Sequence, residues 1–269
     1  MATATVNDRA SRKLPERDDA RLSRFGFVSQ WVVAPFAAIK RIIYPPLCLC
    51  CDADLHDPAA KFCDGCVAEI VSVGPACPFC AATIGPFTDT SHDCLDCSRQ
   101  THRFDAALRL GIYSDKLRDL CLSLKSVHNA LVGPALARLF DAHQGDTLRR
   151  AGANMVVAVP LHFARRFQRG FNQADSIARQ LARVLQLPHR SRLLIRKRRT
   201  RPQAQLNPDE RRDNVRDAFL ARPAAELKGA TVLLVDDILT TGATCSDAAR
   251  ALKAAGAKRV VVAVVARAV

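Results

Sequence analysis

Eight of the eleven cysteines fall in four C-x-x-C pairs, which is a spacing suited to metal binding. A C-x-x-C turn directs two sulfurs at one point, and two such turns supply the tetrahedral thiolate set that Zn²⁺ prefers. Eleven residues separate the first two pairs and thirteen separate the last two, the hairpin length of a zinc ribbon. The sequence therefore predicts two structural zinc sites, each built by neighbouring pairs. The pairs are Cys48/Cys51, Cys63/Cys66, Cys77/Cys80 and Cys94/Cys97.

Other roles for the cysteine segment stay open. The pairs could be redox dithiols or disulfides, although redox C-x-x-C motifs usually occur singly at a strand-to-helix junction. Cys50 lies between Cys48 and Cys51, so any two of these three could bind the metal. We favour ligation by adjacent pairs over a cross-braced arrangement. Cys121 and Cys245 are expected to be small buried residues on helices. Nearby histidines are expected to be bystanders: His56, His92 and His102.

A second candidate site lies between Val232 and Thr244. The apolar run Val232–Val235 is followed by two acids, Asp236 and Asp237, and then by Thr240-Thr241-Gly242-Ala243-Thr244. Free backbone amides at a helix N-terminus bind anions, and a glycine lets the backbone approach them closely. Carboxylates one sugar length away suit vicinal hydroxyls or hydrated Mg²⁺. We predict a cradle for a sugar phosphate, whereas a solvated turn with a Thr cap would explain any single residue of it.

This string resembles the 5-phosphoribosyl-1-pyrophosphate (PRPP) motif of type I phosphoribosyltransferases. That motif is a hydrophobic strand, two acids and then T-T-G-x-T. The chain has neither the G-K-[ST] of a P-loop nor a G-x-G-x-x-G dinucleotide fingerprint at this place. The resemblance implies that PRPP or a related ribose 5-phosphate is bound, together with Mg²⁺, by Asp236, Asp237 and residues 240–244.

Two basic segments fit the same assignment. The first runs from the strand end at Val159-Pro160-Leu161 to Arg169-Gly-Phe-Asn-Gln173, a turn suited to pyrophosphate. The second, Arg190–Arg212, holds nine basic and two acidic residues. It resembles the mobile loop of type I phosphoribosyltransferases in position. We take Arg169 of the first segment and Arg199 of the second as candidate phosphate ligands. In this hypothesis Asp236, Asp237 and Arg169 are the catalytic residues.

The charge of Arg190–Arg212 is also compatible with roles other than pyrophosphate binding. A charge run alone is often a solvated hairpin, and it could also contact single-stranded nucleic acid through the backbone phosphates. Phe, Tyr and Trp are absent between Asn172 and Asp217. The segment therefore lacks the stacking platform that single-strand binders use.

Taken together, these pieces are similar to the ComF-type competence protein family. The match includes the four cysteine pairs, the Arg169 motif, Arg211-x-x-Asn214 and the Asp236 motif, in the order of the family. The resemblance implies a double zinc ribbon joined to a phosphoribosyltransferase domain and a role in DNA uptake during natural transformation. It also implies a competence helicase and recombination proteins as partners, whereas single-stranded DNA as a partner rests on the basic segment alone. It leaves the acceptor substrate, and whether the protein turns over, unspecified.

The elements that must position these residues follow from the apolar pattern. Short apolar runs alternate with amphipathic helices from Phe104 onward, which predicts an α/β fold with a parallel sheet and helices on both faces. Ligands of such folds bind beyond the carboxyl ends of the strands. We expect a tail at 1–43, the double zinc ribbon at 44–101 and the phosphoribosyltransferase-like domain at 102–269. Strands are expected at 106–113, 155–159, 231–235 and 259–266, and helices after Ser114, at 174–185 and at 243–255.

Composition narrows the class of protein further. The chain of 269 residues carries a net charge of +14, with 49% hydrophobic residues, which excludes a wholly disordered protein and favours phosphate-bearing partners. The apolar run Trp31–Ile39 is too short for a membrane span, which needs about 20 residues. We expect a cytoplasmic protein with reduced thiols. Phe25–Leu47 is either an amphipathic docking segment or a helix packed on its own domain.

The motifs are compatible with an enzyme and with a protein that has no catalytic activity. The leading hypothesis is transfer of ribose 5-phosphate from PRPP to an unknown acceptor, a glycosyltransferase reaction in which catalysis is electrostatic and positional. The alternative is a protein without catalysis: a nucleotide sensor, a single-stranded DNA-binding module or a docking factor for a helicase.

Overall fold

The computed structural model describes residues 45–71, 74–85, 94–126, 129–162, 170–198, 200 and 208–268. The expected tail, the amphipathic segment and the candidate ligands Arg169 and Arg199 lie outside this part of the chain. Residues Leu47–Val269 belong to one compact unit. The boundaries proposed at residues 44 and 102 stay predictions.

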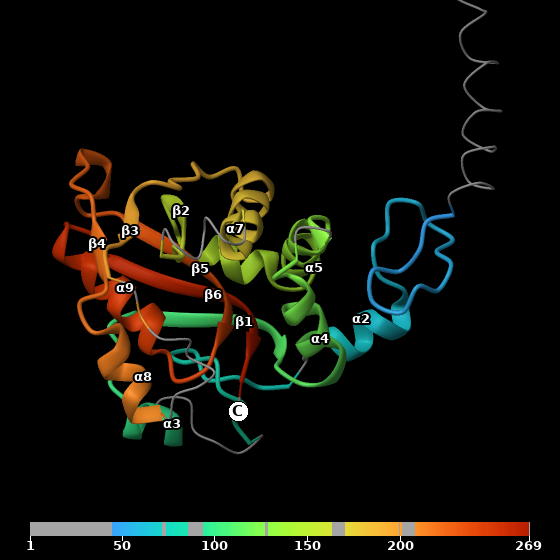
Figure 1. Cartoon of the computed structure of the whole chain (residues 1–269), viewed down its shortest axis with the longest axis horizontal. Coiled ribbons are helices and arrows are strands. Elements are labelled where there is room, and N and C mark those ends of the chain that lie inside the picture. The colour runs from blue at the N-terminus through green and yellow to red at the C-terminus, as the bar shows by residue number, and fades with distance from the viewer. Residues whose placement is uncertain are drawn as a thin grey trace, which may run out of the picture. The chain divides into compact units, whose positions relative to one another are not determined.

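Four parallel strands form the central sheet, in the order β1-β6-β5-β2 (Figure 1). Their bounds are β1 Ala106–Ile112, β2 Met155–Ala158, β5 Thr231–Leu239 and β6 Arg259–Arg267. Almost all side chains of β2 and β6 are buried, as a parallel sheet covered on both faces requires. The predicted fold class, a mixed α/β protein with a parallel sheet, is confirmed.

Two hydrophobic layers cover the sheet, one on each face. Leu233 and Val235 of β5 pack in one layer, whereas Val232 and Leu234 pack in the other, as the alternation of a strand dictates. The first layer is covered by α4 Asp115–Ser123, α5 Val132–Arg150 and α7 Gln173–Val184. The second is covered by α9 Ala243–Ala254 and by a small antiparallel sheet of two strands, β3 Leu194–Arg196 and β4 Phe219–Ala221 (Figure 1). Helix α8, Pro208–Val215, lies against α9.

The cysteine-rich segment contributes two short helices, α2 Asp64–Ile70 and α3 Leu95–Arg99, which lie apart in Figure 1. Ile70 of α2 is fully buried in the layer that contains α4. Lys116 of α4 donates a 2.6 Å hydrogen bond to Glu69 of α2. The segment that carries the second group of cysteines has a contact of its own: the amide of Ala107 in β1 donates a 3.1 Å hydrogen bond to the carbonyl of Pro78. Both cysteine segments are thus attached to the sheet by separate contacts.

One expected strand is longer than the apolar pattern predicts. We expected the run that begins at Thr231 to end at Val235, but β5 continues through both aspartates to Leu239. The extension exists because β6 runs alongside it, pairing Leu239 with Arg267. Helix α5 and the small β3–β4 sheet were not predicted at all. Within the described residues, no helix combines the length and the apolar character needed to cross a membrane.

The close approach of α2 to β1 depends on a glycine. A Cβ atom at Gly111 would lie 2.0 Å from the carbonyl oxygen of Ile70 and 2.7 Å from Leu117. Backbone cannot give way as a flexible side chain can, so the helix would have to move off the sheet. Gly111 is therefore a packing requirement rather than a turn residue.

We expect Gly111→Ala to lower the free energy of unfolding by about 1–3 kcal/mol, the usual cost of an overpacked core. Gly74→Ala is the matched control, since no atom lies within 4 Å of its added Cβ. Chemical denaturation of the two variants measures the difference. Equal stability of the two variants would contradict the packing of α2 against β1.

Candidate functional site

The eight paired cysteines gather into two separate sets of four. Within each set the ligand atoms all lie within 4.8 Å of one another, and both sets are made by neighbouring pairs. All of these cysteines are free thiols. Cys50 belongs to neither set. The first set is Cys48, Cys51, Cys63 and Cys66, and the second is Cys77, Cys80, Cys94 and Cys97.

The chemistry of both sets fits Zn²⁺. Four sulfurs at this separation match tetrahedral thiolate ligation, whereas four thiolates without a cation would repel one another. Burial raises the pKa of the Cys80 thiol to about 12 despite a backbone hydrogen bond from Ala82. Among the described residues, the hydrophobic core around the second set has Cys77, Cys80, Cys94 and Ile84 as its buried members. A metal would thus replace most of a core in this small segment.

The two aspartates at the end of β5 lie on opposite faces of the sheet. The Asp236 carboxylate faces α9, with the thiol of Cys245 at 3.8 Å. The Asp237 carboxylate faces α7 and accepts a 3.0 Å hydrogen bond from Nε2 of Gln173. They diverge because β5 keeps its strand geometry through both residues. We expected both carboxylates to contact the hydroxyls of one sugar, and this geometry does not support that expectation.

The electrostatic environment of Asp236 is unusual. Burial raises the pKa of its carboxyl well above the ordinary value, and the negative charge of Asp237 raises it further. The Asp237 amide donates a 2.9 Å hydrogen bond to Asp236, and the guanidinium of Arg196 acts in the opposite direction on the same pKa. The ionised form of Asp236 would therefore be stabilised by a cation or by a hydrogen-bond donor of a ligand.

The turn after β5 leads into α9 through a glycine in a left-handed conformation. Gly242 is the N-cap of α9 with φ +73°, a left-handed conformation that a side chain disfavours. A glycine cap has no side chain of its own with which to accept hydrogen bonds from the first amides of the helix, which lie at the positive end of its dipole. Thr241 accepts a hydrogen bond from the Ala243 amide at 3.4 Å. Thr240, Thr241, Gly242, Ala243 and Thr244 thus form the turn after β5 and the first residues of α9, while their role as phosphate ligands stays a prediction.

His102, expected to be a bystander, lies directly over this turn. A Cβ at Gly242 would meet the imidazole Cε1 at 2.8 Å. The His102 ring stacks on Phe104 with centroids 4.6 Å apart, and burial and the charge of Arg267 lower its pKa. Gly242 is thus required twice, for its φ angle and for this contact. The sequence carried no periodic signal that linked residue 102 to residue 242.

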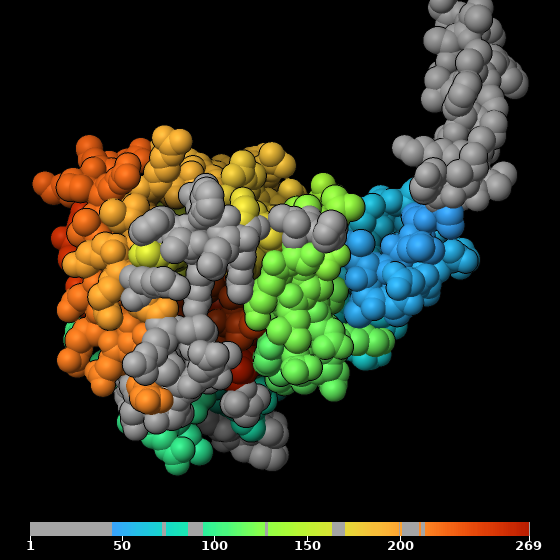
Figure 2. All heavy atoms as spheres, viewed as in Figure 1, coloured from blue at the N-terminus to red at the C-terminus, as the bar shows by residue number. Residues whose placement is uncertain are grey.

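The second motif meets the first at the carboxyl ends of β2 and β5. Asn172 donates from Nδ2 to the carbonyl of Val159 at 3.0 Å, while Gln173 is bonded to Asp237. Gly170, Phe171, Asn172 and Gln173 line a pocket of about 430 Å³. In Figure 2, dark red atoms of the C-terminal strands lie at the bottom of a recess that has green atoms along one side.

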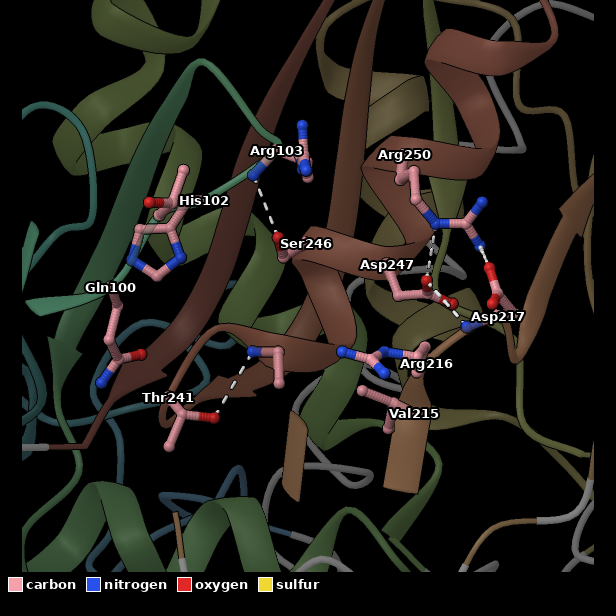
Figure 3. A pocket seen from close by; sticks show the side chains of 12 residues that line it. Gln100, His102, Arg103, Val215, Arg216, Asp217, Thr241, Ser246, Asp247 and Arg250 are labelled. Atoms are coloured by element: carbon pink, nitrogen blue, oxygen red, sulfur yellow. Dashed lines mark hydrogen bonds and ion pairs between the residues drawn. The ribbon is translucent and has the colours of Figure 1, made fainter. Parts of the chain in front are cut away.

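A further pocket of about 390 Å³ lies beside the start of α9 (Figure 3). Figure 3 shows Gln100 and His102 on one side and Asp247 with Arg250 on the other. Asp247 accepts hydrogen bonds from the amides of Asp217 and Phe219, so it joins β4 to α9. Arg250 neutralises it at 2.8 Å.

Two arginines of the basic segment stabilise the small β3–β4 sheet and the end of α8. Arg198 donates to the carbonyls of Asn214 at 3.0 Å and Arg216 at 2.7 Å, at the end of α8. Arg196 lies 5.2 Å from the centroid of the Phe219 ring and donates to the hydroxyl of Thr200. Lys197 is exposed. Arg196 and Arg198 of the charge run are therefore held by contacts within the fold, whereas Lys197 is exposed.

Comparison with known proteins identifies a domain type in the C-terminal part of the chain and a family for the chain. Residues 168–268 match the model of the phosphoribosyl transferase domain. The chain is 31% identical to "Competence protein F" of Haemophilus influenzae over 219 residues, 79% of this chain and 93% of that protein. The chain belongs to the ComF competence-protein family.

Two other relatives of this ComF-family protein extend the comparison. It is 29% identical to "DNA utilization protein YhgH" of Escherichia coli K12 over 80% of this chain and 94% of that protein. It is 27% identical to "Competence protein ComFC" of Streptococcus pneumoniae over 77% of this chain and 87% of that protein. The family resemblance drawn from the motifs is thus confirmed, whereas the ligands of the individual site residues stay predictions.

Metal analysis checks the division of the cysteines. We expect two zinc ions per chain in protein purified without chelator, and two in Cys50→Ser, because Cys50 lies outside both sets. Cys51→Ser removes one ligand of the first set and should retain about one ion after dialysis against a weak chelator. Equal zinc content in the two variants would contradict this ligand assignment.

The Asp236 carboxyl predicts an unusual pH dependence of stability. Its folded-state pKa is raised, so the folded protein holds the proton more tightly than the unfolded chain, and stability falls as pH rises above about 4. We expect Asp236→Asn, without ligand, to be more stable than the parent at pH 7, by a margin that shrinks toward pH 4. Thermal unfolding across this range measures it, with Asp119→Asn on the exposed face of α4 as control. Parallel pH profiles of Asp236→Asn and the parent would exclude a raised pKa.

Proposed function

We propose that this protein binds PRPP with Mg²⁺ and transfers its ribose 5-phosphate to an acceptor. The observation that carries the proposal is the glycine-capped start of α9 at the carboxyl end of β5. There, the first backbone amides of α9 lie at the positive end of the helix dipole, where a phosphate is stabilised, and Gly242 allows its close approach. The phosphoribosyl transferase domain match over residues 168–268 includes this turn and supports the same ligand.

The residues present fit a Mg²⁺ ion held largely by its ligand. Mg²⁺ prefers oxygen donors and is commonly bound by one or two carboxylates plus substrate phosphates. Because Asp236 and Asp237 face opposite sides of β5, they do not form a carboxylate cage of their own. Asp237, beside the Gln173 turn, is the better placed of the two for ribose hydroxyls or hydrated metal. The bound ion would supply charge neutralisation of the diphosphate.

The protein's own residues would act by position and charge. The 240–244 turn holds the 5′-phosphate, so that the anomeric carbon lies between β5 and the Asn172–Gln173 turn. Loss of pyrophosphate develops positive charge on the ribose ring; this charge favours the ionised form of the buried Asp236 carboxyl, which then stabilises it electrostatically. Arg196, whose charge already acts on Asp236, is a candidate to neutralise the departing pyrophosphate, together with Arg169 and Arg199.

We infer a competence role from the relatives, which are named for competence and for DNA utilization. DNA contact through Lys197 and its neighbours is the alternative function without catalysis. Docking to a competence helicase stays a prediction, as does the cytoplasmic location. Calorimetric binding of PRPP separates the enzyme hypothesis from helicase docking alone, and pyrophosphate release separates turnover from sensing.

Gly242→Ala tests the phosphate cradle. We expect it to weaken Mg²⁺–PRPP binding at least about tenfold in titration calorimetry, because the turn must abandon its left-handed φ and His102 must move. Gly229→Ala is the matched control: it has the same φ of +73° but no atom within 4 Å of the added Cβ. Its backbone strain of about 1–2 kcal/mol should lower stability and leave binding intact.

Two outcomes would reject the proposal. Absence of binding heat at millimolar PRPP in the parent protein would remove PRPP as the ligand. Equal binding by Gly242→Ala and the parent would move the ligand away from the start of α9.

A further inference from the structure

Arg267, the last residue of β6, is a buried charge that none of the predicted motifs includes. Its residue is only 6% exposed to solvent. Its guanidinium lies between the second cysteine set and the turn that follows β5. A buried arginine is tolerated only when its donors are matched by acceptors. The identity of those acceptors therefore defines what the side chain does.

On one side, Arg267 contacts the segment that carries the second cysteine set. Its Nε donates to the carbonyl of Cys80 at 3.1 Å. Its Nη2 donates to the carboxylate of Asp96 at 2.9 Å, within the Cys94–Cys97 turn. Both C-x-x-C turns of the second set are thereby joined to one side chain.

On the other side, Arg267 contacts the start of the proposed phosphate turn. Its Nη1 donates to the carbonyl of Thr240 at 2.5 Å and to that of Leu239 at 3.2 Å, and also to the carbonyl of Ala268. The carbonyls of Leu239 and Thr240 immediately precede Thr241 and Gly242. A planar guanidinium with donors on three sides can hold both groups of acceptors at once, which an ammonium group cannot.

We propose that Arg267 is a positioning residue through which the second cysteine set holds the 240–244 turn in its ligand-binding geometry. The ligand of the turn rests on the proposed function, but the ordering of the turn does not. Because the described part of the core around the second set contains little besides its own cysteines and Ile84, we expect the positions of the Cys80 carbonyl and of Asp96 to depend on the metal. Zinc at this set therefore supports a turn that it does not contact.

The first cysteine set provides an internal comparison. Among the described contacts, it is anchored to the sheet domain through Ile70 against Gly111 and through Glu69 with Lys116. Asp64 occupies the Cys63–Cys66 turn as Asp96 occupies the Cys94–Cys97 turn, and it is exposed. Disturbing it should leave the 240–244 turn unchanged.

Hydrogen exchange of the full-length, zinc-loaded chain without any ligand tests the inference directly. We expect Asp96→Ala to raise exchange about threefold to tenfold in peptides that cover residues 240–246, because one charge-assisted contact of Arg267 is lost. Arg267→Lys should raise it further, while Asp64→Ala should match the parent. Zinc content must stay at two ions per chain in the two aspartate variants, which shows that their metal sites are intact.

Binding of Mg²⁺–PRPP to the same variants gives a second readout. Asp96→Ala should weaken binding about threefold to tenfold, and Arg267→Lys about tenfold or more. Unchanged exchange at residues 240–246 in both Asp96→Ala and Arg267→Lys would overturn the inference, whatever PRPP does. If the exchange responds but the parent fails to bind PRPP, the proposed function falls and the positioning role of Arg267 stands.

Discussion

The site depends on the pairing of β5 with β6 beyond the point where the apolar run of β5 ends. Because Leu239 still pairs with Arg267, the chain reaches the 240–244 turn as a strand, with its direction fixed. The same pairing delivers the Arg267 side chain to the carbonyls of that turn. A strand that ended at Val235 would leave four more residues free to move before the turn. Ordering each of these on ligand binding would cost about 1–2 kcal/mol.

Strand geometry also places the two acids in different surroundings. Asp236 lies on the face covered by α9, where burial makes its ionisation costly. Asp237 lies on the α7 face, where Gln173 connects it to the turn after β2. In a ComF-family protein that binds a sugar phosphate, one carboxylate would then act through its field and the other by direct contact. Adjacent acids in a motif thus need not act as a pair.

The sequence predicted the parts that repeat a pattern. The four strands and the helices α4, α7 and α9 follow from apolar periodicity, and the two cysteine sets follow from spacing. Helix α5 was missed because Gly133, Pro134 and Gly145 interrupt its pattern, although Leu136 and Phe140 are buried and hold it against the sheet. His102 and Arg267 were missed because each acts on a turn far away in sequence. Only the folded chain brings such residues together.

The arginines show why charge alone is a poor guide to function in this protein. The segment Arg190–Arg212 contributes half of the net charge of +14, which suggests a surface for polyanions. Yet Arg198 is bonded to the carbonyls at the end of α8, and Arg196 packs over Phe219. Arg267, outside any charge run, makes the contacts that join a cysteine set to the candidate phosphate turn. An arginine whose donors are already matched by carbonyls contributes charge to the field of the site, but it is not available as a direct phosphate ligand. If this protein binds the proposed sugar phosphate, direct anion contacts would therefore depend on backbone amides more than the composition suggests.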